Sequence, residues 1–202
     1  MSKSANKKPI FKKWWFWVII IVVIGGAAGA GASSSNEPKK VDDTGNTTAS
    51  SVVASSKTEE TSFTIGDTAD FDGIKVKLSS AILSNGDGNY IKPDSGKKFL
   101  CLIFDMTNDS KTDINVSSLA SFEAYCDDYS LNIDIMGQQS KEVDGLDSLD
   151  GTVAAGKRMN GVICYQVPEG FKKFDITFKP SFWGDKKVTF TFTGDKVDRS
   201  GL

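Results

Sequence analysis

From Ser62 to the end of the chain, hydrophobic and polar residues alternate with a period of two in several short segments. In residues 74–78, Ile, Val and Leu alternate with Lys, and in residues 188–193 Val and Phe alternate with Thr. This period places every second side chain on one face of a β-strand, so we expect one face of each segment to be buried. The same alternation is found in residues 98–107, 121–126, 131–135, 163–167 and 173–179.

Turn-forming residues separate these segments. They form the clusters Gly66-Asp67, Asn85-Gly86-Asp87-Gly88, Asn108-Asp109-Ser110 and Gly184-Asp185. Seven or more short strands with turns between them, and no clear helical pattern, predict an all-β antiparallel sandwich that buries its phenylalanines between two sheets. Residues 136–157 have no clear period, so they are predicted to form a long loop with at most one helical turn.

Residues 14–32 differ from the rest because they contain no charged or strongly polar side chain. As a helix they would extend ~28 Å, close to the thickness of the hydrocarbon core of a bilayer. Five lysines and no acid precede Trp14, which by the positive-inside rule places the N-terminus in the cytoplasm. We therefore expect a basic cytoplasmic tail (1–13) followed by one transmembrane helix (14–32), with the C-terminal domain extracellular.

A cleaved signal peptide is the alternative interpretation of this segment. Its strongly apolar run, residues 18–24, is short, and Ala30-Gly31-Ala32 fits the small-x-small cleavage pattern. Cleavage after Ala32 would give a secreted protein, whereas retention gives a single-pass protein of the cell membrane. The Trp-rich start directly after lysines favours retention, because tryptophan is enriched at membrane interfaces.

Residues 33–61 are rich in Ser, Thr, Asn and Lys and contain almost no large apolar residue. Such a segment cannot bury enough surface to offset its ordering entropy, so it is predicted to be a disordered linker with an r.m.s. span of roughly 30 Å. This leaves residues 62–202 as one folded domain outside the cytoplasm.

The charge and the residue types of that domain exclude several classes of function. From Ser62 onward there are 16 Lys and Arg against 21 Asp and Glu, which offers no basic face for nucleic acid. The chain has no histidine, which excludes catalytic triads, Cys-His pairs and the usual catalytic zinc sites. We expect no enzyme, no cofactor and no nucleic-acid partner.

Three stretches resemble one bacterial family. They are Asp94-Ser95-Gly96-Lys97-Lys98-Phe99-Leu100, Gly161-Val162-Ile163-Cys164-Tyr165-Gln166-Val167-Pro168 and Phe178-Lys179-Pro180-Ser181-Phe182-Trp183. That family is a domain of unknown function with a telokin-like, immunoglobulin-like β-sandwich, found on Gram-positive membrane-anchored surface proteins and lipoproteins. The resemblance covers roughly residues 62–193, and it implies the fold but no catalytic residues.

The three cysteines, Cys101, Cys126 and Cys164, match no zinc or CxxC spacing. They could be three buried thiols acting as small apolar side chains. Alternatively, Cys101 and Cys164 lie at outward positions of strands that are antiparallel neighbours in an immunoglobulin-like order, within reach of a disulfide. Cys126, at an inward position, would then be a buried free thiol.

An acidic loop contains three carboxylates that are weak candidates for a calcium site: Asp144, Asp147 and Asp150. Their spacing is not that of an EF-hand, and solvated acidic loops are far more common. No other metal site is expected.

The pattern as a whole predicts a membrane-anchored extracytoplasmic binding module of the bacterial cell envelope. Its ligand would be a protein or an envelope polymer, recognised through loops or a sheet edge. Tyr90, Phe182 and Trp183 could form an aromatic surface, although packing in the core or at a sheet edge is the more common role. The alternative function is an envelope sensor or stress protein that acts through cysteine oxidation or calcium.

Overall fold

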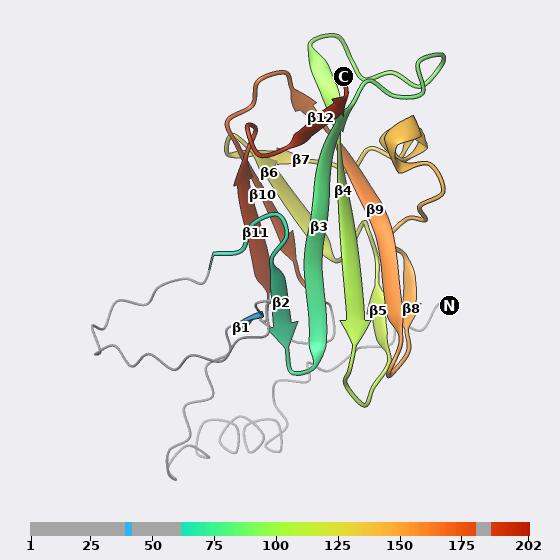
Figure 1. Ribbon diagram of the computed structural model, residues 1–202, viewed down its shortest axis with the longest axis vertical. Coiled ribbons are helices and arrows are strands. Elements are labelled where there is room, and N and C mark those ends of the chain that lie inside the picture. Colours follow the sequence, from blue (N-terminus) through green and yellow to red (C-terminus); the bar gives the residue numbers. More distant parts are fainter. Residues whose placement is uncertain (1–38, 42–61, 181–186) are drawn as a thin grey trace, which may run out of the picture. The chain divides into compact units, whose positions relative to one another are not determined.

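Two β-sheets pack face to face in the computed structural model, which describes residues 39–41, 62–180 and 187–202 (Figure 1). The first sheet has six strands. Their order is β1 (Lys39–Val41), β2 (Thr68–Phe71), β3 (Ile74–Ser84), β4 (Lys97–Asn108) and β9 (Arg158–Pro168), with β12 (Asp198–Gly201) paired to β3. β12 runs parallel to β3. The first sheet is therefore mixed, whereas the sequence predicted an antiparallel one.

The second sheet has four strands, and a separate pair lies beside the sandwich. The order of the second sheet is β11 (Val188–Thr193), β10 (Lys173–Phe178), β6 (Phe122–Cys126) and β7 (Tyr129–Leu131). The separate pair is β5 (Ile114–Val116) with β8 (Gly151–Val153). The predicted all-β sandwich is therefore confirmed.

Aromatic side chains from both sheets meet in the core. The ring of Phe104 on β4 lies 5.3 Å from that of Phe122 and 5.8 Å from that of Phe190, measured between centroids. At the other end of the core, the ring of Tyr165 on β9 lies 5.6 Å from that of Phe174 on β10. Contacts of this kind across the two sheets confirm the inward faces that the alternation predicts.

A β-bulge at Ser79 lets β3 remain in the sheet over its whole length. The register shifts between the pair Leu78–Phe104 and the pair Ser80–Ile103, so Ser79 has no partner residue on β4. The inward positions are therefore Leu78 before the bulge and Ala81 after it.

Two predicted segments differ in the structure. The strand expected over residues 131–135 ends at Leu131, because the chain leaves the second sheet there and the backbone N–H of Asp134 donates to Cys164 O of β9 (2.7 Å). The loop expected over residues 136–157 contains two short 3₁₀ helices, η2 (Met136–Gln139) and η3 (Lys141–Val143), followed by β8.

The N-terminal predictions lie almost wholly outside the described residues. Of the predicted disordered linker over 33–61, only Lys39–Val41 are described, and they form β1 and pair with β2. The remainder of the linker, the tail 1–13 and the segment 14–32 are not among the described residues. Within the residues that are described, no helix is long and apolar enough to cross a membrane.

Candidate functional site

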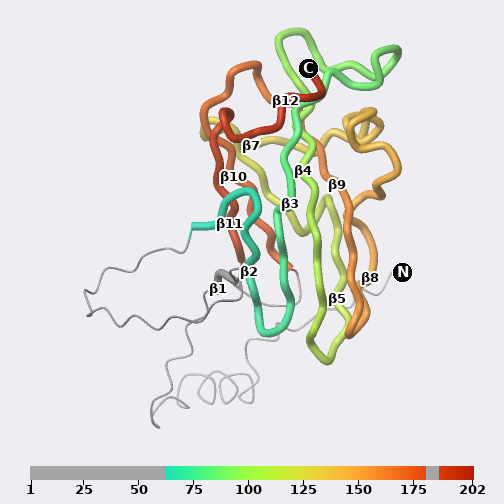
Figure 2. The backbone as a smooth tube through the Cα atoms, viewed as in Figure 1, coloured from blue at the N-terminus to red at the C-terminus, as the bar shows by residue number. Residues whose placement is uncertain are grey.

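The outer face of β4 and β9 is covered by a second, smaller hydrophobic cluster. Its buried members are Phe99, Cys101, Val143, Val162 and Cys164, and Ile91, Ile103 and Leu146 pack against them. Residues 132–150, which we call the cover, lie over these strands, and the loop of residues 85–96 contributes Ile91. Figure 2 shows this loop extending beyond the ends of β3 and β4, at the end of the sandwich that we call the upper end.

The cover is fixed to the edge of β9 by hydrogen bonds. Besides the bond from Asp134, the backbone N–H of Val162 donates to Asp147 O (2.9 Å) and the side chain of Gln166 donates to Asp134 Oδ2 (2.6 Å). The bonds of Cys164 O and Val162 N–H occupy backbone groups that would otherwise be exposed at the edge of the sheet.

The sequence contains a signal for this cover. Residues 99–104 of β4 and 161–165 of β9 are almost continuously apolar instead of strictly alternating. Continuous apolar runs are typical of strands that are buried on both faces. The expectation that Cys101 and Cys164 face outward is right about the face of the sheet, but that face is not exposed to solvent.

The register places Cys101 of β4 directly opposite Cys164 of β9. The two Sγ atoms are 2.8 Å apart, and both cysteines are fully buried free thiols in this structure. Gly137 of the cover lies over the pair, with its carbonyl oxygen 3.5 Å from Cys101 Sγ. Burial raises the pKa of Cys164 far above its ordinary value. The predicted disulfide between the two remains a prediction.

Cys126 lies elsewhere, in the main core between the two sheets. It is a buried free thiol. Burial is the main reason that its pKa rises from 9.0 to about 11.

The three aspartates of the acidic loop are not gathered around one point. Asp144 and Asp147 are exposed, and Asp150 accepts hydrogen bonds from the backbone N–H (2.9 Å) and the hydroxyl (2.8 Å) of Ser118. No group of three or more His, Cys, Asp or Glu residues among those described is placed to hold a metal ion. Calcium binding by Asp144, Asp147 and Asp150 stays a prediction that this arrangement does not support.

A buried polar contact, which the sequence did not indicate, joins the cover to the upper end of β3. The side chain of Glu142 is only 10% exposed, and its Oε2 accepts a hydrogen bond from Ser84 Oγ. Ser84 Oγ in turn accepts a hydrogen bond from the backbone N–H of Gly86 (2.9 Å). Gly201 of β12 packs so closely here that a Cβ would lie 2.7 Å from Glu142 Cδ. The cover, the loop of residues 85–96 and β12 therefore support one another.

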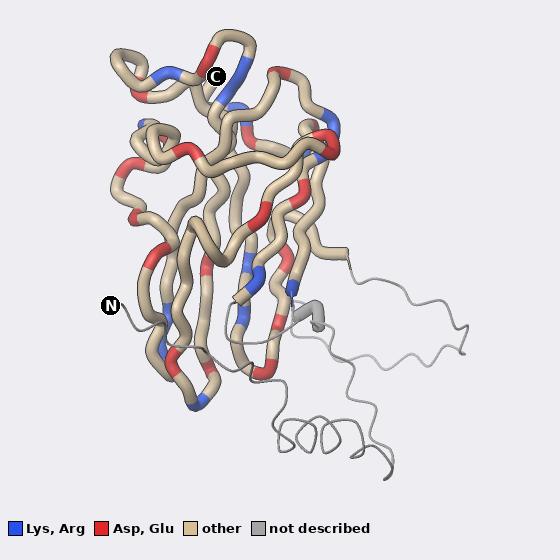
Figure 3. Tube along the Cα trace, turned by 180° about the vertical axis from the view of Figure 1, so that it is seen from behind, with Lys and Arg blue, Asp and Glu red and all other residues tan. Residues whose placement is uncertain are grey.

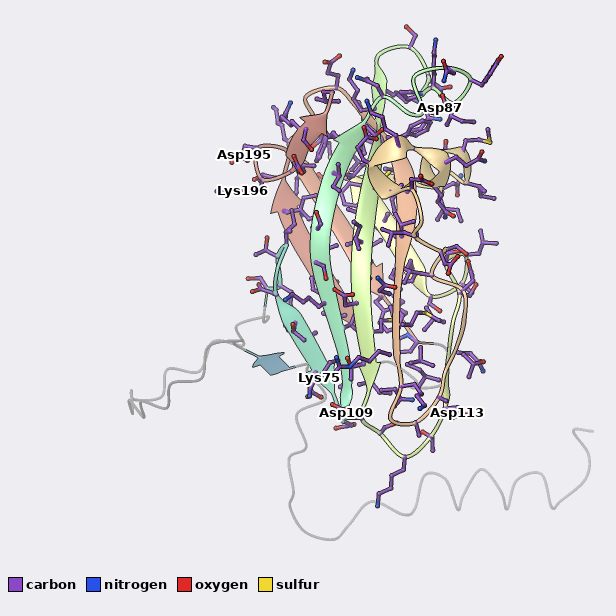
Figure 4. The ribbon with its side chains drawn as sticks, turned by 45° about the vertical axis from the view of Figure 1, so that its right-hand side comes forward. Lys75, Asp87, Asp109, Asp113, Asp195 and Lys196 are labelled. Atoms are coloured by element: carbon purple, nitrogen blue, oxygen red, sulfur yellow. The ribbon has the colours of Figure 1, made fainter. Side chains whose placement is uncertain are left out.

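The loop of residues 85–96 is held by its own hydrogen bonds. Asp87 Oδ1 accepts hydrogen bonds from the backbone N–H groups of Asn89 (2.7 Å) and Ile91 (2.8 Å), which lower the pKa of Asp87. Gly86 has a φ of +93°, and a Cβ there would lie 1.8 Å from Ile91 O, so only glycine fits. Figure 4 shows Asp87 at the upper end, away from Lys75, Asp109 and Asp113 at the opposite end.

This ordered upper end presents large side chains to solvent. Tyr90 is 94% exposed, and Ile135 and Met136 of the cover are 64% and 49% exposed. Their chain neighbours Ile91 and Gly137 pack on the second cluster, Gly137 against the ring of Phe99. Of the predicted aromatic surface, Tyr90 is exposed, whereas Phe182 and Trp183 lie outside the described residues.

On the back of the described part of the sandwich, the charged residues are not gathered by sign. In Figure 3, which shows the back of the sandwich, acidic and basic residues are interspersed along the strands and loops. Individual pairs are close, as where Lys179 Nζ lies 2.5 Å from Glu123 Oε2 on the second sheet.

Comparison with known proteins supports the fold. A family model described as Domain of unknown function (DUF4352) matches residues 63–188. The chain is similar in structure to a proposed lipoprotein (ycdA) of Bacillus subtilis, with 21% identity and a TM-score of 0.50 over 61% of this chain and 37% of that one. It is also similar to a proposed lipoprotein of Staphylococcus aureus (20% identity, TM-score 0.48, 67% and 94% of the two chains). A third similar structure is the yjhA protein of B. subtilis (18% identity, TM-score 0.46, 67% and 99%). No curated protein matches the sequence.

Proposed function

Because the chain belongs to the DUF4352 family, whose description names no activity, we propose a function from its own surface: a binding module of the bacterial cell envelope. In this proposal residues 14–32 hold the protein in the membrane and the domain binds a partner protein outside the cytoplasm. The binding surface is the upper end of the sandwich, formed by the loop of residues 85–96 and the cover.

The exposure of Tyr90 on an ordered loop is the observation that carries the proposal. The bonds of Asp87 and the packing of Ile91 fix the backbone on both sides of Tyr90, yet its side chain is almost fully exposed. An exposed tyrosine that loses little conformational entropy on binding is typical of protein-binding surfaces. The aliphatic side chains of Ile135 and Met136 suit a protein partner better than a glycan.

The location rests on the N-terminal sequence. The lysines before Trp14, the apolar segment 14–32 and the polar linker are the expected parts of a membrane-anchored surface protein. The similar ycdA protein of B. subtilis is described as a proposed lipoprotein, which is consistent with an envelope role.

The sensor alternative is less well supported. A sensor thiol must be accessible and have a low pKa, whereas Cys101 and Cys164 are fully buried and the pKa of Cys164 is raised. The calcium route has no cluster of ligands among the described residues.

Site-specific photo-crosslinking in the full chain tests the proposal. We would replace Tyr90 by p-benzoylphenylalanine, express the protein in a Gram-positive host and irradiate intact cells. We expect a discrete adduct with one protein at position 90, identified by mass spectrometry.

Leu119 is the matched control, because it is also exposed but lies between β5 and β6, in neither the loop of residues 85–96 nor the cover. The same replacement there should give no adduct with that protein. The proposal is contradicted if position 90 gives no adduct, or if both positions capture the same proteins equally.

A further inference from the structure

The pair Cys101 and Cys164 has a geometry that suits a covalent bond. Directly opposite residues of antiparallel strands have Cα atoms about 4.5–5.5 Å apart, within the range that a disulfide spans. The Sγ atoms, 2.8 Å apart, are about 0.8 Å from disulfide bonding distance. We propose that these two residues form a disulfide in the exported domain, that the bond forms before the cover closes, and that the closed cover then shields it.

The oxidant in this proposal is a disulfide of an extracytoplasmic thiol–disulfide oxidoreductase. The thiolate of one cysteine attacks that disulfide and forms a mixed disulfide, which the second thiolate resolves. Two S–H bonds break and one S–S bond forms in the domain. The two electrons released reduce the disulfide of the oxidant to a dithiol. The two protons lost by the domain's thiols are transferred to that dithiol through solvent.

Burial determines when this reaction can occur. Neither sulfur is exposed in the folded domain, and Gly137 with Val143 of the cover lies over them. Attack requires an accessible thiolate, so the exchange has to take place while the cover is open, during folding after export. The proposal rests on the export part of the proposed function but not on binding at the upper end.

The position of Cys126 makes the pairing specific. Cys126 faces the main core, whereas Cys101 and Cys164 face the cover on the opposite side of the first sheet. Once the strands have paired, Cys126 cannot approach either of the other two sulfurs.

Peptide mapping of the full chain tests the bond. The protein in membranes from expressing cells would be denatured in the presence of N-ethylmaleimide, which blocks free thiols. It would then be digested without reductant. We expect a cross-linked peptide pair containing Cys101 and Cys164, together with alkylated Cys126. Alkylation of all three cysteines in protein whose domain has been exported across the membrane would overturn the proposal.

Refolding in vitro separates a failure of the bond from a failure of export. The full chain would be reduced, unfolded and refolded in detergent with a glutathione redox buffer. We expect the same bond in the wild type and in Cys126→Ser, and no intramolecular bond in Cys101→Ser. Pairing that involves Cys126, or no pairing at all, would overturn the assignment whatever the location of the protein in cells.

The rate of reduction tests the shield. We expect dithiothreitol to reduce the bond at least 100-fold more slowly in the folded protein than in denaturant. Val143→Ala, which loosens the cover, should raise the native rate about 10-fold, whereas Val153→Ala in the main core should not. Equal rates in the folded and denatured protein would show that the cover does not protect the bond.

Discussion

Gly137 lies where the cover packs closely on the first sheet. A Cβ at this position would lie 2.8 Å from Cys164 Cβ and 3.0 Å from Phe99 Cδ1. Both neighbours are buried and cannot move away freely, so a methyl group here has to displace the cover.

Gly137→Ala should therefore destabilise the domain by about 1–3 kcal/mol, the usual cost of adding a methyl group to a packed core. Urea unfolding measures the change. Gln139→Ala, on the exposed side of the same short helix, is the control and should change the free energy of unfolding by less than about 0.5 kcal/mol. Equal stability of Gly137→Ala and the wild type would mean that the cover does not pack as described.

Cys126 makes the stability of the domain depend on pH in the alkaline range. Its pKa is about 11 in the fold and 9.0 for an unburied thiol, so the unfolded chain loses the proton first as the pH rises. The stability that this thiol contributes is complete below pH 9 and is lost as the pH rises through 11, by up to about 2 kcal/mol.

Unfolding measured from pH 8 to pH 11 in the wild type and in Cys126→Ala checks this prediction. The difference in free energy between the two proteins should shrink as the pH rises, because only the wild type contains this group. A difference that stays constant over this range would show that the pKa of Cys126 is not raised.

At the scale of elements, the two sheets are held together by aromatic contacts. The ring of Phe174 on β10 lies 5.3 Å from that of Phe192, 5.6 Å from that of Tyr165 and 6.2 Å from that of Phe171. Phe174 is fully buried and so joins β9 of the first sheet to the second sheet.

Phe174→Ala should lower the free energy of unfolding by about 3–5 kcal/mol, because it leaves a cavity between the sheets. Tyr125→Ala is the matched control, an aromatic residue on the outer face of neighbouring β6 that is 41% exposed, and it should cost less than about 1 kcal/mol. Thermal unfolding of the two variants measures both values. Similar losses would contradict the assignment of the inner face.

The alternation in the sequence predicted the long strands well, because each has one face in the main core. It did not predict β5, β7 or β8, since a strand of three residues has no measurable period. The cover has a different origin: a segment without a period is indistinguishable from a loop, although the apolar run of residues 99–104 indicates a second buried face. The contact between Glu142 and Ser84 joins residues far apart in the chain, so no local pattern contains it.

At the scale of the whole molecule, the proposed arrangement is a membrane segment that carries a displayed domain. The family match and the sandwich support the domain, and the lysines and apolar run of the N-terminal sequence support the anchor. Cleavage after Ala32 remains the alternative to retention, and the two differ in whether residues 1–13 stay with the mature chain.

The location of the lysines tests this claim most directly. Intact Gram-positive cells that express the full chain would be treated with an amine-reactive reagent that does not cross membranes, and the modified lysines would be mapped by mass spectrometry before and after lysis. We predict that the exposed residues Lys92, Lys111 and Lys157 are modified in intact cells, whereas Lys7 and Lys8 are modified only after lysis. Domain lysines that react only after lysis, or a mature chain that lacks residues 1–13, would contradict a membrane-anchored domain displayed outside the cytoplasm.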